Sequence, residues 1–235
     1  MRKLPPRSTV SEQVYQAILD EVCGGRLSPG MHLVQEELAA RLGVSRQPVQ
    51  QAMAMLKADG VVEERGARGL HVAPLDLASM RHRYAIRGTL DALAARGVAL
   101  AVQAGDLTIL PQARRLIDSG RAAIAAGDIR ALVAADVGFH QFVYGASGNP
   151  LIAATAELHW RFLRRVMADV LLHAEPPFEI WDQHEAIVAA IAAGDGEAAG
   201  QRAHDHVLHA ADRLTSAMAK WRTAEPSPRQ GAFVA

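Results

Sequence analysis

The 235-residue sequence contains a single cysteine, Cys23, and few aromatic residues, only 5% of the total. One cysteine cannot form a disulfide within the chain, which is typical of proteins that work in a reducing cytoplasm. Half of the residues are hydrophobic, which is enough to form a buried core. Because Ala and Leu recur throughout and are strong helix formers, we expect this core to be mainly helical.

The sequence also lacks a long apolar run and an excess of either charge. No stretch of about 18 uncharged apolar residues is present to span a membrane, and the basic start MRKLPPRSTV is not followed by the apolar run of a signal peptide. We therefore expect a cytoplasmic protein without a membrane partner. The formal net charge is +0, so binding to DNA would depend on where the basic residues lie rather than on their total.

The first 75 residues carry the start and stop signals of three short helices. Thr9 and Glu12 form the T-x-x-E pattern of a capping box, which predicts a helix from there to about Cys23. A second helix is predicted over residues 35–42, and a third from the N-cap residue Ser45 to near residue 60. The third helix has one apolar face, formed by Val49, Met53 and Leu56.

After residue 60 the pattern changes from helix to strand. Residues 61–64 and 70–72 are two short runs on either side of a glycine-rich tip, which predicts a β-hairpin. Two helices joined by a tight turn form a helix-turn-helix, and the hairpin behind them would be its wing. A helix-turn-helix alone is a weak sign of DNA binding, because many enzymes contain similar helical corners. The hairpin directly after it strengthens the interpretation.

The third helix and the hairpin tip would present the side chains that contact DNA. Arginine can donate two hydrogen bonds to a guanine edge and glutamine can pair with adenine, whereas serine and free amides at a helix start suit phosphate. Arginines between glycines at a hairpin tip suit phosphate or the minor groove. The candidate DNA-binding residues are Ser45, Arg46, Gln47, Gln50, Arg65, Arg68 and Gly69.

The pattern from about residue 77 to residue 221 is almost entirely helical. We expect about six helices, with breaks near Gly105, Gly127, residues 148–150, residues 176–177 and Gly194. The segment Ile-Ala-Ala-Gly-Asp occurs at 124–128 and at 191–195, where glycine would end one helix and aspartate would cap the next. Two apolar stripes stand out: Ile86, Leu90, Leu93 and Leu100 near the start, and Val207, Ala211, Leu214 and Met218 near the end.

These signals predict a mainly α protein with two domains. Residues 1–75 would form the winged helix-turn-helix, residues 76–223 an all-α helical-bundle effector domain, and residues 224–235 a flexible tail.

The helical region also contains residues of the types that bind divalent metals. Asp136 and His140 are four residues apart and so share one face of a helix, while His184 and His206 lie on later helices. One carboxylate and three imidazoles suit zinc, nickel or manganese. The chain has ten histidines, however, and an Asp-x-x-x-His pair on a helix is more often a solvated or locally bonded pair.

The stretch PGMHLVQEELAARLGVSRQPVQQAMAMLKADGVVEERGARGLHVAP closely resembles the winged helix of the GntR family of bacterial regulators, over roughly residues 8–74. The resemblance implies that Ser45, Arg46, Gln47 and the wing from Arg65 to Gly69 contact operator DNA. Where the family usually has P-V-R-E-A-L, this chain has Pro-Val-Gln-Gln-Ala-Met, so Gln50 replaces an arginine that normally contacts DNA. This departure implies an altered operator or a weaker phosphate contact.

Residues from about 78 to 221 resemble the FCD domain of the FadR branch of that family, in its six-helix, VanR-like form. The resemblance implies that Asp136, His140, His184 and His206 bind a metal ion, with His204 as a competing candidate for the last ligand. It also implies two effector-binding residues. Arg87 would pair with an effector carboxylate; the alternative is an ordinary surface ion pair. Asn149 matches a position common in the family and would also bind the effector; the alternative is that it only caps a helix.

By resemblance we expect a homodimeric repressor or activator that is not an enzyme and that responds to a small organic acid. Paired operator half-sites need paired DNA-binding domains, which also favours a dimer. Two alternatives remain open at this point. The helical domain could be a metal-dependent enzyme that activates water, or it could sense the metal itself.

Overall fold

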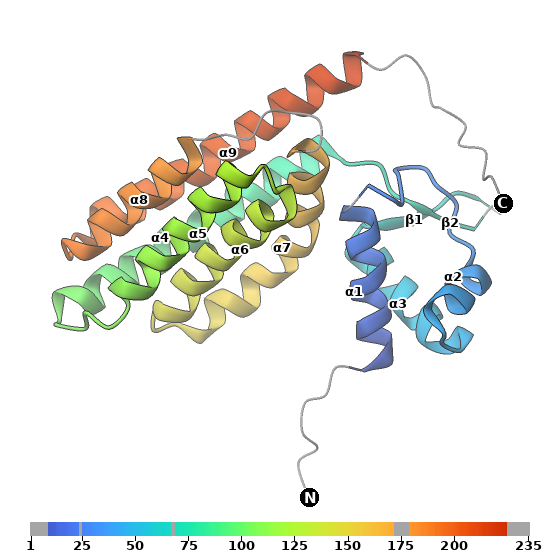
Figure 1. The fold of residues 1–235 in the computed structure, drawn as a ribbon, viewed down its shortest axis with the longest axis horizontal. Helices are drawn as coiled ribbons and strands as arrows, with labels where there is room; N and C mark the ends of the chain where they lie inside the picture. The colour runs from blue at the N-terminus through green and yellow to red at the C-terminus, as the bar shows by residue number, and fades with distance from the viewer. Residues whose placement is uncertain (1–8, 24, 67–68, 172–178, 225–235) are drawn as a thin grey trace, which may run out of the picture. The chain divides into compact units, whose positions relative to one another are not determined.

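The computed structural model describes residues 9–23, 25–66, 69–171 and 179–224 (Figure 1). Within these ranges the elements are α1 (Val10–Cys23), α2 (Gln35–Leu42), α3 (Arg46–Ala58), β1 (Val62–Glu64), β2 (Leu70–Val72), α4 (Leu77–Gln103), α5 (Leu110–Ala126), α6 (Ile129–Ala146), α7 (Pro150–Leu171), α8 (Glu179–Ala192) and α9 (Gly196–Ala224). The expected tail at the C-terminus falls outside these ranges, apart from residue 224. The mainly α fold class is confirmed.

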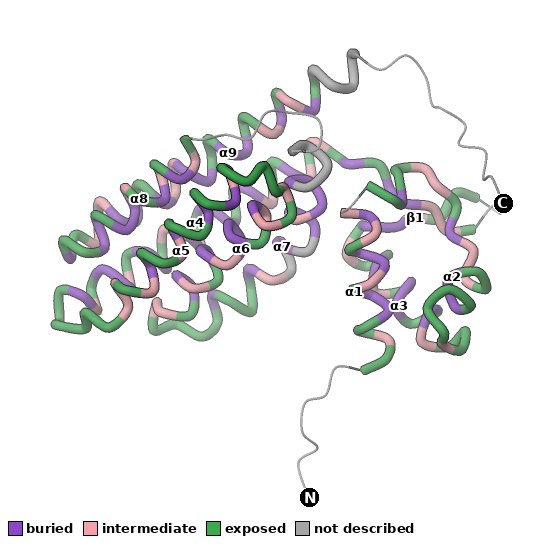
Figure 2. The backbone as a smooth tube through the Cα atoms, in the orientation of Figure 1, coloured by how far each residue is buried: buried purple, intermediate pink, exposed green. Residues whose placement is uncertain are grey.

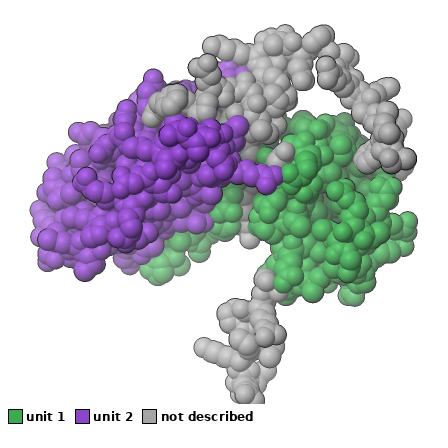
Figure 3. Space-filling view, viewed as in Figure 1, with its two compact units in different colours: residues 1–83, 150–169 green, residues 84–149, 170–235 purple. Residues whose placement is uncertain are grey.

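The chain divides into two compact units, coloured separately in Figure 3. One comprises residues 1–83 and 150–169, and the other comprises residues 84–149 and 170–235. Helix α7, up to residue 169, is thus counted with the winged helix. The domain boundaries expected from the sequence, at residues 75 and 223, stay a prediction.

The predicted capping box starts α1. The backbone N–H of Glu12 donates to the Thr9 hydroxyl at 3.2 Å, and the backbone N–H of Thr9 donates to the Glu12 carboxylate at 2.7 Å. Two amide donors that the helix itself leaves without a partner are satisfied in this way. The prediction of a helix start at Thr9 is confirmed.

Helices α2 and α3 form the helix-turn-helix. Gly43 ends α2 with a φ of 66°, a left-handed conformation that glycine adopts without a steric penalty. Ser45 occupies the predicted N-cap position of α3, but its side chain makes no capping hydrogen bond. The face of α3 predicted to be apolar is buried against the core of the first unit, through Val49, Met53 and Leu56.

Strands β1 and β2 form the predicted antiparallel hairpin, with Val62 opposite Val72. The segment before α2 lies along β2, because the N–H of Leu33 donates to the Leu70 carbonyl at 2.8 Å. Gly69 has a φ of 85°, which fits its place at the hairpin tip. The neighbouring predicted DNA-binding residue Arg68 lies outside the described residues.

Within the first unit, Arg165 of α7 forms hydrogen bonds to both ends of the hairpin. The residue is only 2% exposed. Its guanidinium donates to the carbonyl of Val61, just before β1, at 3.4 Å, and to the carbonyl of Ala73, just after β2. A buried arginine needs such acceptors, because leaving its donors unsatisfied away from water is costly. No local sequence pattern predicts this long-range contact.

In the part of the chain that the structure describes, residues 77–224 form the expected six helices, α4 to α9. Both copies of the repeated segment lie where one helix ends and the next begins, as predicted. Gly127 ends α5 and Asp128 caps α6, accepting from the N–H of Ala131 at 3.0 Å, while Asp195 caps α9 by accepting from the N–H of Ala198 at 2.9 Å. The predicted break at residues 176–177 lies outside the described ranges. None of the described helices has the length and apolar character needed to cross a membrane.

The two apolar stripes of the helical region have different environments (Figure 2). On α9, Val207, Ala211 and Met218 are buried and Leu214 is half-buried. On α4 the stripe faces outward instead, because Ile86 is 48%, Leu93 48% and Leu100 52% exposed. The core side of α4 is formed by other residues, including Ala94, Ala95, Val98 and Ala99.

Candidate metal centre and nucleic-acid interface

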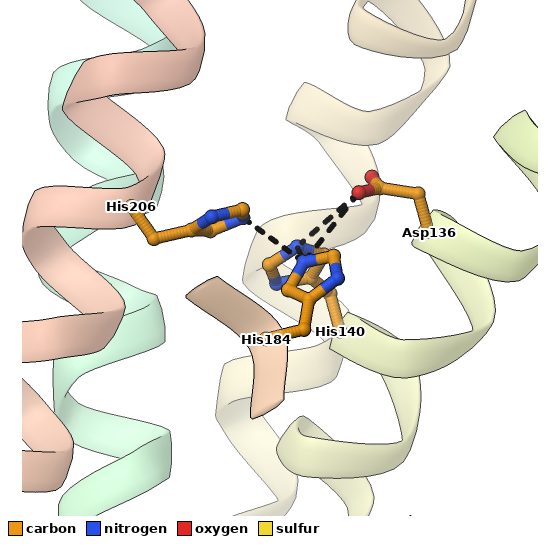
Figure 4. Close-up of side chains that lie close together, drawn as sticks. All are labelled: Asp136, His140, His184 and His206. Carbon is orange, nitrogen blue, oxygen red and sulfur yellow. Dashed lines mark hydrogen bonds and ion pairs between the residues drawn. The ribbon is translucent and has the colours of Figure 1, made fainter. Parts of the chain in front are cut away.

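The structure brings the four predicted metal ligands together (Figure 4). Asp136 and His140 project from α6, His184 from α8 and His206 from α9, and one potential ligand atom of each lies within 4.8 Å of the others. All four side chains are buried. His204, the competing candidate, is outside this cluster and its Nδ1 lies 3.6 Å from Asp205 on the same helix.

The three imidazoles present the same ring nitrogen to the centre of the cluster. His184 Nε2 lies 3.3 Å from His140 Nε2 and 3.1 Å from His206 Nε2. For metal–nitrogen bonds of about 2.1 Å, two neighbouring nitrogen ligands on one ion lie roughly 3.0–3.4 Å apart. Asp136 Oδ1 lies 3.6 Å from His184 Nε2 and 3.9 Å from His140 Nε2, somewhat beyond this range. The donors therefore have the types that bind a divalent cation, and the distances from His184 to the other two imidazoles have the spacing that one ion requires.

Burial keeps two of these histidines neutral. It lowers the pKa of His184 well below the usual value, and the neighbouring His206, His140 and Arg87 act in the same direction. The pKa of His206 is also lowered well below the usual value, again first by burial and then by His140 and Arg87. A neutral imidazole keeps a lone pair on one ring nitrogen, which is the form that binds metals.

The outward-facing ring nitrogens differ in their partners. His140 Nδ1 lies 3.1 Å from Asp91 Oδ2, and His206 Nδ1 lies 2.9 Å from the amide oxygen of Gln183. His184 Nδ1 is buried and has no hydrogen-bond partner among the described residues. Neither partner was predicted from the sequence. Asp91 had one usable signal, its position four residues after Arg87, whereas nothing local distinguishes Gln183.

Asp91 is the centre of a buried polar group. Its Oδ2 lies 3.4 Å from Arg87 Nε, and its Oδ1 accepts from the Tyr144 hydroxyl. Burial alone would raise the pKa of Asp91, but the pKa is lowered because the charges of His140 and Arg87 and the hydrogen bonds to this carboxylate outweigh burial. The lowered pKa favours the ionised carboxylate beside His140, a candidate metal ligand.

The two predicted effector-binding residues have very different environments. Arg87 is 2% exposed, so the alternative of a surface ion pair is wrong and the pairing with Asp91 is internal. Its guanidinium also lies 5.5 Å from the centre of the Tyr84 ring. Asn149 is exposed in the turn before α7, where its backbone N–H donates to the Ser147 hydroxyl, and it lies outside the buried cluster.

Aromatic side chains line one side of the cluster. The ring centre of Phe139 is 4.2 Å and that of Trp181 is 4.6 Å from that of His184. Trp181 fits because Gly120 on α5 has no side chain, since a Cβ there would overlap the indole ring. An apolar wall of this kind strengthens electrostatic interactions by excluding water.

The predicted DNA-binding residues of α3 lie on its exposed face: Ser45, Arg46, Gln47 and Gln50. Arg46 forms an ion pair of 2.8 Å with Glu36 of α2, but both side chains are mostly exposed, at 72% and 65%. At the hairpin, Arg65 is exposed and pairs with Glu63 at 2.7 Å. Exposed ion pairs contribute little free energy, so these arginines can exchange a carboxylate for a phosphate or base at low cost.

Two family models match the sequence. Residues 10–72 match the model described as bacterial regulatory proteins, gntR family, and residues 82–209 match the FCD domain. The FCD match alone covers more than half of the chain.

Relatives match along most of the chain. The HTH-type transcriptional repressor RspR of Escherichia coli K12 is 27% identical over 205 residues, 87% of this chain and 89% of that protein. A probable D-xylose utilization operon transcriptional repressor of Paenarthrobacter nicotinovorans is 30% identical over 204 residues, 86% of this chain and 87% of that protein. These relatives are transcriptional regulators, so the alternative of a metal-dependent enzyme is not supported.

Solved structures share the fold. E. coli McbR/YncC has a TM-score of 0.75 at 22% identity, covering 89% of this chain and 99% of that one. A putative GntR regulator from Rhodococcus sp. RHA1 has a TM-score of 0.71 at 24% identity, covering 88% of this chain and 97% of that one.

Proposed function

The chain belongs to the GntR family of bacterial regulators and carries an FCD domain, and from this premise we propose that it is a cytoplasmic repressor controlled by a small organic acid bound at a metal centre. As a GntR/FCD protein it is a DNA-binding transcriptional regulator rather than an enzyme. The proposal adds the metal, the effector and the dimeric state. The repressor role is suggested by the names of the relatives.

The observation that carries the metal proposal is the convergence of three imidazole Nε2 atoms and one carboxylate in a buried site. We propose Asp136, His140, His184 and His206 as ligands of zinc, nickel or manganese. When bound with six-coordinate geometry, such an ion supplies two positions open to the oxygens of an organic acid. Arg87 is the favoured partner for the effector carboxylate because it is buried beside this cluster, whereas exposed Asn149 is the weaker candidate.

DNA recognition is assigned to α3 and the wing: Ser45, Arg46, Gln47, Gln50, Arg65, Arg68 and Gly69. The test is to recover DNA fragments bound by the full-length protein and to sequence them. We expect an enriched sequence with two half-sites separated by one or more helical turns. Small organic acids should then change binding to that operator when the protein is metal-loaded. Enrichment of no sequence would contradict the regulator proposal, and a response to metal alone would favour a metal sensor.

The Gln50 position provides a prediction about phosphate contacts. Gln50 is exposed on α3, where the family usually has arginine. Gln50→Arg should strengthen binding to DNA of any sequence and steepen the dependence of log K on log salt by about 0.9, the value for one added phosphate contact. Fluorescence anisotropy across a salt series measures both. An unchanged salt slope would show that residue 50 does not face the DNA backbone.

The exposed stripe of α4 supports a homodimer. Ile86, Leu93 and Leu100 are seven residues apart, so they lie along one line of the helix, and Leu90 lies between them. Heptad-spaced apolar residues are typical of a helix that packs against another helix. A second copy of the chain is the proposed partner, because two operator half-sites need two DNA-binding domains.

Leu93→Glu should therefore convert the dimer to a monomer, because it places a charge in the middle of the apolar stripe. Sedimentation velocity measures the change in mass. Leu151→Glu is the matched control, since Leu151 is even more exposed, at 71%, but lies on α7. If both variants have the mass of the wild type, or if both are monomers, α4 is not specifically the dimer interface.

A further inference from the structure

We propose that Asp91 is a positioning residue of the metal centre, whose carboxylate pairs with His140 Nδ1 and thereby directs the lone pair of His140 Nε2 toward the ion. The inference rests on the proposed metal function and adds a residue that is not itself a ligand.

Three side chains contact the carboxylate of Asp91. His140 Nδ1 of α6 lies 3.1 Å from Oδ2, and Arg87 Nε of α4 lies 3.4 Å from the same oxygen. The Tyr144 hydroxyl donates to the other oxygen, Oδ1. Asp91 is only 2% exposed, and a buried carboxylate needs opposite charge close by. Oδ1 is hydrogen-bonded, whereas the two contacts of Oδ2 are ion-pair contacts without the geometry of a hydrogen bond. Its position relative to the His140 ring is therefore fixed.

The contact with Asp91 determines which nitrogen of His140 faces the metal. A ring that binds a metal through Nε2 carries its proton on Nδ1, and Asp91 Oδ2 lies 3.1 Å from that atom as its acceptor. The lone pair is then on Nε2, the atom that lies 3.3 Å from His184 Nε2 at the centre of the cluster. A carboxylate behind a metal-binding histidine also makes the ring a stronger ligand.

The three histidines are supported unequally. His140 has a charged acceptor in Asp91, His206 has a neutral one in Gln183 at 2.9 Å, and His184 Nδ1 has none among the residues the structure describes. Hydrogen bonds to a charged acceptor are about twice as strong as neutral ones. Asp91 should therefore contribute more to metal affinity than Gln183.

Asp91 also connects the metal site with Arg87. Arg87 and His140 contact the same carboxylate oxygen, so the proposed metal ligand His140 and the proposed effector-binding arginine are separated by a single side chain. The assignment gives Arg87 a structural role beside its proposed effector contact, because its positive charge favours the ionised form of Asp91.

The test uses the full-length protein and zinc alone, with dissociation constants measured by competition against a chromophoric chelator. Asp91→Asn should weaken zinc binding about 10- to 100-fold, the range typical for loss of such a partner. Asp205→Asn is the matched control, because Asp205 also neighbours a histidine, His204 at 3.6 Å, but outside the cluster. Its zinc affinity should equal that of the wild type.

Two further measurements separate positioning from a general effect on folding. In a His140→Ala background, Asp91→Asn should cause no additional loss of zinc affinity, because Asp91 acts through His140. Nitrogen-15 spectra of wild-type histidine rings should show the His140 proton on Nδ1, and this observation needs no variant that might misfold. Absence of zinc binding by the wild type would refute the metal proposal itself. Three results would overturn the role of Asp91 alone. Asp91→Asn could bind zinc with the affinity of the wild type, or it could cause the same loss of zinc affinity in the His140→Ala background as in the wild type. The third result is a His140 proton on Nε2.

Discussion

Protein purified with His184 replaced by alanine should contain no divalent metal, and chelator should not lower its melting temperature. His184 is fully buried, and its Nε2 lies within 3.6 Å of a donor atom on each of Asp136, His140 and His206. An ion bound only by the folded state stabilises it by about 2.7 kcal/mol at a concentration of 100 times Kd. For a chain of this size that corresponds to roughly 5–10 °C in Tm.

Metal content by mass spectrometry and Tm by calorimetry test this expectation. His206→Ala should also lose the metal, whereas His204→Ala is the control that should keep it, because His204 lies outside the cluster. Chelator should lower the Tm of the wild type and of His204→Ala but not that of His184→Ala. Metal retained by His184→Ala, or lost equally from His204→Ala, would show that the ligands are wrongly assigned.

Arg46→Ala should lower operator affinity by about 1–3 kcal/mol, roughly 10- to 100-fold, the typical value of a good base contact. Arg46 begins α3, its side chain is 72% exposed, and it forms an ion pair with the exposed Glu36. Because exposed pairs contribute little to stability, the variant should unfold at nearly the same temperature as the wild type.

Binding of operator and of unrelated DNA, measured side by side, tests this prediction. Arg202→Ala is a suitable control, since Arg202 is an exposed arginine on α9 with no proposed DNA contact. The loss for Arg46→Ala should be larger on operator than on unrelated DNA, as expected for a base contact. Unchanged operator affinity would mean that α3 is not the recognition helix.

Much of the fold could be predicted because its signals are local. The capping box at Thr9 and Glu12, the glycine after α2 and the Gly-Asp pair between α5 and α6 each act within a few residues. The exposed face of α4 could not be assigned, because its leucines have the same spacing whether they face the core or a partner chain. The contact of Arg165 with the hairpin joins residues about 100 positions apart, which no local pattern encodes.

The candidate site was predictable in part for the same reason. Helical spacing places Asp136 and His140 on one face, but only the resemblance to the FCD domain selected His184 and His206 from ten histidines. The residues behind the ligands depend on how α4, α6, α8 and α9 pack. Asp91 on α4 contacts His140 on α6, and Gln183 on α8 contacts His206 on α9. Both contacts join different helices, so they could be identified only from the structure.

Calorimetric titration of small organic acids into metal-loaded and chelator-stripped protein tests the central claim most directly, namely that effector binding depends on the metal. We predict that at least one acid binds the metal-loaded protein and that its affinity falls when the metal is removed. Loss of affinity on Arg87→Gln, with metal retained, would add support for the carboxylate contact. Equal binding of acids by both forms, in a protein that gains no stability from zinc, nickel or manganese, would contradict the metal-centred account.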